Sequence, residues 1–268
     1  MKKMKTLCCI LFCILNCTPF LSAGEMRIVS LSPALTELVC HLGCEKQLVG
    51  RSSVCNYPQS VKKIAVAGRF SIPYTEKVIS LKPDIVIAND LVNPNLVKTF
   101  AACHIRCEIM PCRNIAEYRK CVEKLSRLLN VETAGKREIA RIDEKLRQKI
   151  KKLNLNVLWV IWDSPLMVAG KNSLPDELLK MAGANNVAEH VPQAYFKCSL
   201  DWLLKQKIDA VIWTASPNGY KRHRFWKNLP AVKNNKIIHD LDYDLVQRPG
   251  PRIFDGIELL RKKLENIK

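Results

Sequence analysis

Residues 131–153 read VETAGKREIARIDEKLRQKIKKL, and the rest of the chain divides into two similar halves on either side of them. Five apolar residues in this stretch step by 3, 4, 4 and 3 positions, which places them on one face of an α-helix. These residues are Ile139, Ile142, Leu146, Ile150 and Leu153. The positions between them are mostly charged, and no proline interrupts the run. At ~1.5 Å rise per residue, the stretch predicts one helical rod of roughly 30 Å over residues 131–154, which is long enough to join two lobes.

A short repeat supports the division into halves. Residues 76–87 align without a gap on residues 201–212, so that Glu76 falls on Asp201 and Asp84 on Asp209. In both copies an acidic residue opens a short helix, a basic residue closes it, and an aspartate leads into an apolar strand. The pattern indicates one supersecondary unit that is used twice.

The amino terminus resembles a secretory signal. Lys2, Lys3 and Lys5 precede an apolar run over residues 6–21, and Ser-Ala-Gly follows at 22–24. The run is shorter than the ~20 residues that a membrane-spanning helix needs, so we expect residues 1–24 to be an export signal that delivers the protein to the periplasm or an equivalent space. Cys17 matches a lipoprotein signal poorly, and lipid anchoring there is not expected.

Composition narrows the class of protein. The 268 residues include 48% hydrophobic and 25% charged residues, which is ordinary for a globular protein, and the formal net charge is +18. Loss of the three signal lysines leaves +15. A basic balance fits nucleic acid, an anionic surface, an anionic small ligand or solvated lysines. The lysines here follow helix faces without interleaved aromatic residues, so we favour solvated faces and expect no nucleic-acid partner.

Eight cysteines follow the signal, an even number that suggests disulfides in an exported protein. Sequence alone does not choose among about 105 pairings. Seven of the eight precede the long stretch, so any bridges would lie mostly in the first half. A zinc or iron–sulfur site is the alternative, but the chain has no Cys-x-x-Cys pair.

The expected strands and helices alternate, which predicts mainly parallel sheets. We expect strands at 27–31, 48–50, 84–88, 105–110, 156–162, 209–213 and 236–239, and helices at 33–42, from Pro73, and at 94–102, 115–129, 174–181, 200–206 and 253–264. The fold class is therefore α/β, with two Rossmann-like lobes over 25–130 and 155–268 joined by the single long helix. A ligand cleft is expected between the lobes.

Several segments together resemble a known family, the periplasmic substrate-binding proteins of ABC importers for iron chelates, haem and cobalamin. The resemblance rests on RIVSLSPALTE at 27–37, CNYP at 55–58, residues 76–84, AGK at 169–171 and RPGPR at 248–252. It covers nearly the whole exported chain and is greatest for the cobalamin-binding members. It implies two α/β lobes bridged by one helix, a metal chelate bound between them, and delivery of that ligand to a membrane permease.

The resemblance also implies a binding site. Phe70 and Tyr195 fall at matching loop positions of the two halves, where aromatic groups pack on the flat face of a corrin or porphyrin. The remaining predicted ligand-binding residues are Trp162, Tyr243, Asp244, Gln247 and Arg248. The alternatives are that Phe70 and Tyr195 anchor loops and that Arg248 and Arg252 bond carbonyl groups before the last helix. The chain departs from the cobalamin binders at Asn89 and Asp90, where a cleft tryptophan would be expected.

Glu76 and Asp201 match the two acidic positions, one on each lobe, that in this family dock into arginine-rich pockets of the permease. Two separated charges would fix the orientation and steer the approach. The alternative is that both carboxylates favour the amino-terminal ends of their helices.

Other functions have less support in the sequence. The five histidines are scattered, and neither a His-Glu-x-x-His, a Gly-x-Ser-x-Gly nor a phosphate-binding glycine loop occurs, so an exported hydrolase is disfavoured and no enzyme activity is expected. Direct capture of a metal ion by His190, His239 and carboxylates is a further alternative. We expect a monomeric receptor without a cofactor of its own, whose rigid linker allows only a small hinge closure on binding.

Overall fold

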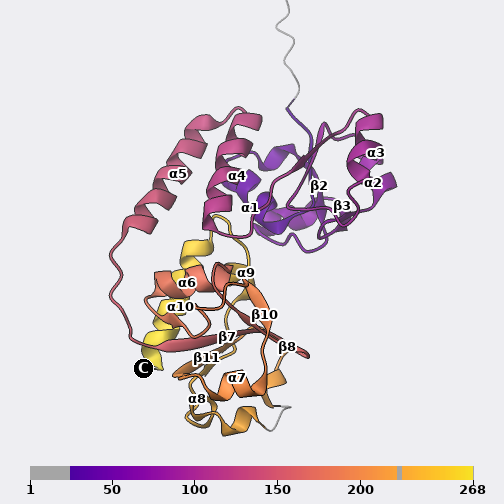
Figure 1. The fold of residues 1–268 in the computed structure, drawn as a ribbon. Coiled ribbons are helices and arrows are strands. Elements are labelled where there is room, and N and C mark those ends of the chain that lie inside the picture. The colour runs from indigo at the N-terminus through magenta and orange to yellow at the C-terminus, as the bar shows by residue number, and fades with distance from the viewer. Residues whose placement is uncertain (1–24, 222–224, 268) are drawn as a thin grey trace, which may run out of the picture.

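The structure is a computed structural model that describes residues 25–221 and 225–267. Two α/β lobes lie one above the other in Figure 1. The first lobe contains β1 (Ile28–Ser30), α1 (Pro33–His41), β2 (Leu48–Ser52), β3 (Val66–Arg69), β4 (Ile72–Pro73), α2 (Thr75–Ser80), β5 (Ile85–Ala88), α3 (Leu96–Ala102), β6 (Arg106–Ile109), α4 (Ile115–Leu128) and α5 (Glu132–Arg147). The second contains β7 (Asn156–Asp163), β8 (Leu166–Ala169), α6 (Leu174–Ala182), β9 (Asn185–Asn186), β10 (Tyr195–Lys197), α7 (Leu200–Leu204), β11 (Ala210–Trp213), α8 (Pro230–Lys233), β12 (Ile237–Ile238), α9 (Tyr243–Val246) and α10 (Ile253–Asn266). Residues 1–24, with the predicted export signal and Cys17, lie outside the described residues.

Each lobe has a six-stranded sheet that is mainly parallel, as the sequence predicts. The first sheet has the order β4-β3-β2-β1-β5-β6, and its antiparallel pair is β3–β4. The second has the order β10-β8-β7-β11-β12, with β9 beside β7. Its strands β7, β9, β11 and β12 are parallel, whereas β8 and β10 form an antiparallel edge that the sequence did not reveal.

Local sequence explains how the first helix is placed. β1 is buried on both faces, as expected for a central parallel strand. The Ser32 side chain then accepts a hydrogen bond from the Leu35 amide, Pro33 occupies the first turn, and Gly43 takes a left-handed conformation just after the helix. The predicted start at Pro33 is confirmed, and the last helical residue, His41, comes one before the predicted end at Leu42. The helix expected from Pro73 begins two residues later, at Thr75, because Pro73 belongs to β4.

The predicted repeat is confirmed in both geometry and hydrogen bonding. α2 and β5 in the first lobe correspond to α7 and β11 in the second, and each strand pairs in parallel with the first strand of its own lobe. A carboxylate oxygen of Asp84 accepts from the Arg27 amide at 2.7 Å, and one of Asp209 accepts from the Asn156 amide at 2.9 Å. The two aspartates therefore join the same two strands in each lobe.

The long helix is shorter than predicted. α5 ends at Arg147, and residues 148–155 continue as an extended segment, visible between α5 and β7 in Figure 1. We name residues 148–155 the connector. Continuing the helix would bring Lys145, Lys149 and Lys152 onto neighbouring turns, where like charges disfavour a helix. An extended chain also spans ~3.3 Å per residue against ~1.5 Å in a helix, so the connector reaches the second lobe.

The connector is held by the second lobe. Leu153 and Leu155 are buried, and the Leu153 amide donates to the Gly183 carbonyl at 2.7 Å. Leu153, whose spacing suggested that the helix continues, therefore belongs to a hydrophobic cluster with residues of the second lobe, whereas Leu146 is exposed. In the parts that the structure describes, 25–221 and 225–267, no helix has both the length and the apolar content to cross a membrane.

The two lobes share one hydrophobic core. Leu35 and Tyr118 of the first lobe belong to the same continuous cluster as Trp159 and Phe254 of the second. Glu138 of α5, whose side chain is almost fully buried, links these parts. It accepts hydrogen bonds from Tyr118 at 2.7 Å and from Arg141 at 2.7 and 2.8 Å, and lies 2.9 Å from the His41 ring nitrogen. Arg141 also donates to the Pro251 carbonyl at 2.7 Å, just before α10.

Glu138 gives a pH-dependent stability prediction. Burial alone would raise the pKa of its carboxyl group, but hydrogen bonds from His41, Arg141 and Tyr118 outweigh burial and lower the pKa from 4.5 to about 2. Because the folded-state pKa is the lower one, the carboxylate stabilises the fold above pH 4.5, and the stabilisation is lost as pH falls from 4.5 towards 2. We expect Glu138→Gln to lower the free energy of unfolding by about 2 kcal/mol near neutral pH and to flatten its acid dependence. Urea unfolding followed by circular dichroism at several pH values measures both effects.

The matched control is Glu144→Gln, an exposed carboxylate on the same helix. Its substitution should change the free energy of unfolding by less than about 0.5 kcal/mol. Equal stability of the Glu138→Gln variant and the parent protein near neutral pH would contradict the role given to Glu138.

Candidate functional site

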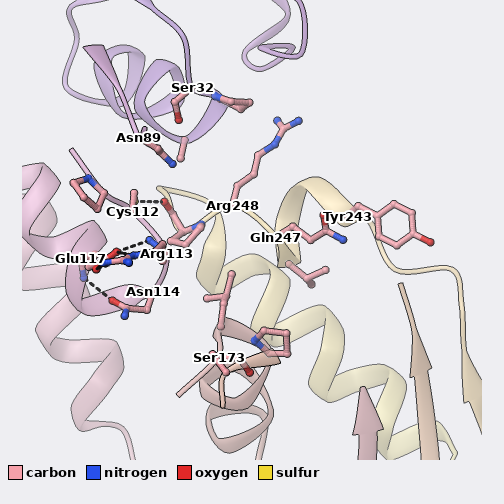
Figure 2. Close-up of a pocket in the computed structure, with 18 of the residues that line it drawn as sticks. Ser32, Asn89, Cys112, Arg113, Asn114, Glu117, Ser173, Tyr243, Gln247 and Arg248 are labelled. Carbon is pink, nitrogen blue, oxygen red and sulfur yellow. Dashed lines mark hydrogen bonds and ion pairs between the residues drawn. The ribbon is translucent and has the colours of Figure 1, made fainter. Parts of the chain in front are cut away.

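A cavity of about 1090 Å³ lies between the two lobes and takes residues from both (Figure 2). Its walls are formed where strands of the two sheets end. Asn89 and Asp90 follow β5, Pro111 to Asn114 follow β6, and Thr214 follows β11. Ligands of open parallel sheets bind at the carboxyl ends of the strands, and here two such ends face one cavity.

Three helices also begin at the cavity. The first residues or caps of α1, α4 and α6 line it, and the side chains of Ser32, Asn114 and Ser173 cap these helices by accepting from their own backbone amides. The amino-terminal ends of helices carry a partial positive charge. They therefore suit oxygen acceptors on a ligand, such as amide carbonyl groups.

The structure brings together six of the seven predicted ligand-binding residues. Phe70 and Tyr195, one from each lobe, line the cavity with their side chains 49% and 44% exposed, so the rings are available to a ligand and do not anchor their loops in the core. Tyr243, Asp244, Gln247 and Arg248 line it as well. Figure 2 shows Tyr243, Gln247 and Arg248 on the second-lobe side, with Asn89 facing them from the first lobe.

Trp162 does not line the cavity. Side chains alternate between the two faces of a strand, and Trp159 and Ile161 of β7 point to the cavity. Trp162 therefore belongs to the opposite face, where it is 56% exposed and its indole N–H donates to the Ser164 carbonyl at 2.8 Å. The alternation of side chains along the predicted strand 156–162 could have indicated that Trp162 and Ile161 face opposite sides.

Arg248 is already bound within the protein. Its guanidinium donates to the Asn56 side chain at 2.7 Å, lies 2.5 Å from an oxygen of Asp244, and reaches buried Glu37 at 3.2 Å. Arg252 forms a two-pronged pair with the same Glu37, at 2.7 and 2.8 Å. The alternative prediction was that both arginines bond carbonyl groups just before α10. Among the described residues, neither side chain forms such a bond. Sequence reasoning missed Glu37, which precedes its partners by more than two hundred residues.

Arg113 and Glu117 form a second self-contained pair in the cavity wall, shown by the dashed lines in Figure 2. The Arg113 guanidinium contacts both carboxylate oxygens of Glu117 at 2.5 to 3.1 Å. The hydrogen bond from Arg113 lowers the pKa of Glu117 and keeps it ionised. The sequence analysis missed this pair, although the spacing of four residues at a helix start could have indicated it.

Both guanidinium groups of the cavity wall are therefore neutralised, and one carboxylate is in excess. Its three carboxylates are Asp90, Glu117 and Asp244, and its two guanidinium groups, Arg113 and Arg248, are both engaged with carboxylates. Among the described residues that line the cavity, none is lysine, histidine or methionine. The other polar groups are the side-chain amides of Asn89, Asn114, Asn172 and Gln247, the hydroxyls of Ser32, Ser173, Tyr195, Thr214 and Tyr243, and the thiol of Cys112.

Glu76 and Asp201, the two residues predicted to dock on a permease, do not line the cavity. Both are exposed in the first turns of α2 and α7. The cap of α7 is the Ser199 side chain, and α2 has no side-chain cap. Neither carboxylate forms an ion pair with any residue of 25–221 or 225–267, so both are available to an external partner.

The expectation of disulfides is wrong in this structure. The eight cysteines after the signal are free thiols: Cys40, Cys44, Cys55, Cys103, Cys107, Cys112, Cys121 and Cys198. Five are buried, and they bond mainly to hydroxyl and carbonyl groups, while the Cys112 and Cys121 thiols also form a hydrogen bond with each other. Cys112, for example, donates to the Pro249 carbonyl at 3.1 Å.

Metal-binding side chains do not converge in the described part of the chain. Among residues 25–221 and 225–267, no three histidine, cysteine, aspartate or glutamate side chains form a group that could hold a metal ion. His190 stacks on Trp202 and His239 on Tyr220, with ring centroids 6.2 and 5.4 Å apart. Neither histidine lines the cavity.

Comparisons with known proteins give relatives that cover most of the chain. The family model described as periplasmic binding protein matches residues 28–243. The uncharacterized ABC transporter substrate-binding lipoprotein YvrC of Bacillus subtilis is 27% identical over 252 residues, which cover 89% of this chain and 79% of YvrC. A vitamin B12-binding protein of Vibrio vulnificus is 25% identical over 274 residues, covering 99% of this chain and 98% of the relative.

A solved structure with a similar fold is the periplasmic haem-binding protein HutB of Vibrio cholerae. Its TM-score is 0.79 at 20% sequence identity, with 90% of this chain and 99% of the other covered. At this identity the likeness concerns the fold alone.

Proposed function

The chain belongs to the periplasmic binding protein family, and from this premise we propose that it captures a corrinoid, a cobalamin-like ligand, between its lobes and delivers it to the permease of an ABC importer. In this proposal the protein is a receptor without catalytic activity, acts as a monomer, and is exported by residues 1–24. The observation that carries the choice of ligand is the cavity wall, in which both guanidinium groups are already neutralised by carboxylates of the same wall.

The size and the aromatic walls support a large flat ligand. Typical small-molecule sites measure ~300 to 1,000 Å³, and this cavity of about 1090 Å³ lies just above that range. Phe70 and Tyr195 present exposed rings from opposite lobes. Such rings pack well on the apolar faces of a macrocycle.

The polar groups of the wall support a ligand that is rich in amides. The side-chain amides of Asn89, Asn172 and Gln247 can both donate and accept hydrogen bonds, and the Asn114 amide can still donate, whereas the Ser173 and Thr214 hydroxyls already donate to the Gly170 and Val160 carbonyl groups. Corrinoids carry amide side chains around the ring. Neutral donors and acceptors at helix starts match these groups without the cost of burying an unpaired charge.

Haem is the second candidate, because Tyr195 and Tyr243 offer phenol groups that could bind the iron. Two features disfavour it. Tyr195 is partly buried, and this partial burial raises its pKa, which opposes the phenolate that would bind iron. The propionates of haem would also meet guanidinium groups that are already paired. A ferric siderophore rich in carboxylates would meet the same obstacle, and a bare metal ion finds no group of ligands in the described part of the chain.

Delivery to a permease would use Glu76 and Asp201. The two carboxylates lie at equivalent positions of the repeat, one on each lobe, and both are exposed. Two acidic contacts on separate lobes would hold the receptor in one orientation over a basic partner.

Ligand choice is tested by titrating the purified protein with cyanocobalamin, haem and a ferric siderophore while recording tryptophan fluorescence. Trp159 borders the cavity, so a bound ligand should quench it. We expect cyanocobalamin to bind most tightly, and Phe70→Ala with Tyr195→Ala to weaken it about 30-fold, since each stacked aromatic contributes about 1 kcal/mol. Tyr74→Ala, which removes an equally exposed ring outside the cavity, is the control. Tighter binding of haem than of cyanocobalamin would overturn the proposal.

The charge argument predicts a gain of binding. Glu117→Gln removes the carboxylate that occupies Arg113 and leaves a guanidinium free for a propionate. We expect haem affinity to rise several-fold and cyanocobalamin affinity to stay unchanged, both by fluorescence titration. Glu123→Gln breaks an equivalent pair with Arg127 on the same helix outside the cavity and should change neither affinity. An unchanged haem affinity in the Glu117→Gln variant would contradict the view that charge balance selects the ligand.

The docking assignment is tested by Glu76→Ala combined with Asp201→Ala. We expect uptake of labelled ligand into cells to be lost while ligand affinity stays the same, because the two residues lie outside the cavity. Glu132→Ala, an exposed carboxylate in the first turn of α5, is the control and should leave uptake intact. Normal uptake by the double variant would reject the assignment.

A further inference from the structure

A second hollow of about 360 Å³ lies where the connector passes α10, and it shares no residue with the interlobe cavity. It is bounded by the end of α5, the connector, the end of α6 and one face of α10. The residues that line it are Lys145, Gln148, Lys149, Ile150, Lys151, Met181, Phe254, Ile257, Glu258 and Arg261. We name this hollow the connector pocket.

The connector pocket has a surplus of positive charge. Lys145 pairs with Glu258 at 2.7 Å, and Arg261 pairs with Glu265 at 2.9 Å. Lys149 and Lys151 are exposed, and neither forms an ion pair with any described residue of the chain. Two lysines on one extended segment therefore face the same hollow without a counterion.

Helix ends do not account for these two lysines. Cations often neutralise the carboxyl-terminal end of a helix, but here Lys145 and Arg147 already occupy the last turn of α5. At the end of α6, the Ala182 carbonyl accepts from Arg261 at 3.1 Å and the Gly183 carbonyl accepts from the Leu153 amide at 2.7 Å. Both helix ends are satisfied without Lys149 or Lys151.

The pocket is also fixed in shape and partly apolar. Arg261 donates to the Lys151 carbonyl at 3.0 Å, which holds the connector against α10. Ile150 and Met181 are half-buried and line the pocket together with the buried Phe254 and Ile257, and we call these four apolar residues the apolar floor. A cationic rim over an apolar floor fits an amphiphilic anion better than it fits a free inorganic ion.

We propose that the connector pocket binds the phosphate group of an amphiphile such as an anionic phospholipid, with Lys149 and Lys151 at the phosphate and the hydrocarbon part on Ile150 and Met181. Lysine ammonium groups bind phosphate as point charges, and exposed lysines favour anionic lipid headgroups. An occupant would touch the connector and α10 together, so it would stabilise the junction between α5 and the second lobe.

The test is calorimetric titration of the full protein with three probes: a short-chain phosphatidate, a phosphocholine with the same chains, and inorganic phosphate. We expect the phosphatidate to bind at least tenfold more tightly than either of the others. Lys149→Gln with Lys151→Gln should weaken it at least tenfold, whereas Lys136→Gln with Lys152→Gln, which removes two exposed lysines outside the pocket, should not.

The outcomes separate the sources of binding. Inorganic phosphate that binds as tightly as the phosphatidate would overturn the part of the proposal that uses the apolar floor. Equal loss in both double variants would indicate a general charge effect and would also overturn it, as would the absence of binding. Because the pocket is separate from the interlobe cavity, these results do not depend on which ligand the cavity holds.

Discussion

The relative position of the two lobes depends on the ion pairs around Glu37. This carboxylate of α1 is buried, and it binds Arg252 at 2.7 and 2.8 Å and Arg248 at 3.2 Å, both from the second lobe. The Arg252 guanidinium also lies 3.8 Å above the centre of the Tyr57 ring. Desolvating three charged groups is costly, and the cost is offset only when all partners are present in good geometry. The arrangement therefore favours a single placement of residues 248–252 against the first lobe.

A second buried carboxylate acts on the same short segment. Glu138 holds Arg141, and Arg141 donates to the Pro251 carbonyl, while Cys112 donates to the Pro249 carbonyl. The prolines limit the freedom of this segment before it is bound. The spacing between the lobes is thus set by side chains packed at the centre of the molecule. The sequence analysis predicted that a rigid helix sets this spacing. The helix instead ends at Arg147, and the chain beyond it is extended.

Features that depend on residues close together in the chain could be predicted from the sequence, whereas features that depend on distant residues could not. The cap at Ser32, the stop at Gly43 and the repeat with Asp84 and Asp209 depend on neighbouring residues or on a gapless alignment, and all are confirmed. The end of α5 was predicted wrongly because Leu153 has its helical spacing but packs on another lobe.

Within the candidate site, the repeat predicted the positions of the two aromatic residues, but no sequence pattern predicted which charged side chains pair with each other. Phe70 and Tyr195 occupy equivalent positions of the repeat, so the same local fold in each lobe brings both to the cavity. The state of Arg248 depends on Glu37 and Asn56, which no local pattern connects to it. The antiparallel edge of β8 and β10 was missed for a related reason, since two short strands with α6 and β9 between them carry no local signal of pairing.

The distribution of charge across the molecule follows from these contacts. The whole chain has a formal net charge of +18, yet the cavity wall holds three carboxylates against two guanidinium groups. An uncompensated cation inside the cavity would attract small anions, which would compete there with an uncharged ligand, whereas water and salt screen the field of a surface lysine before it reaches the cavity. Pairing Arg113 with Glu117 and Arg248 with Asp244 keeps both arginines as rigid hydrogen-bonding groups while cancelling most of their long-range field. For the ligand proposed above, recognition in the cavity would then depend on shape and neutral hydrogen bonds, and the surplus positive charge remains on outer surfaces such as the connector.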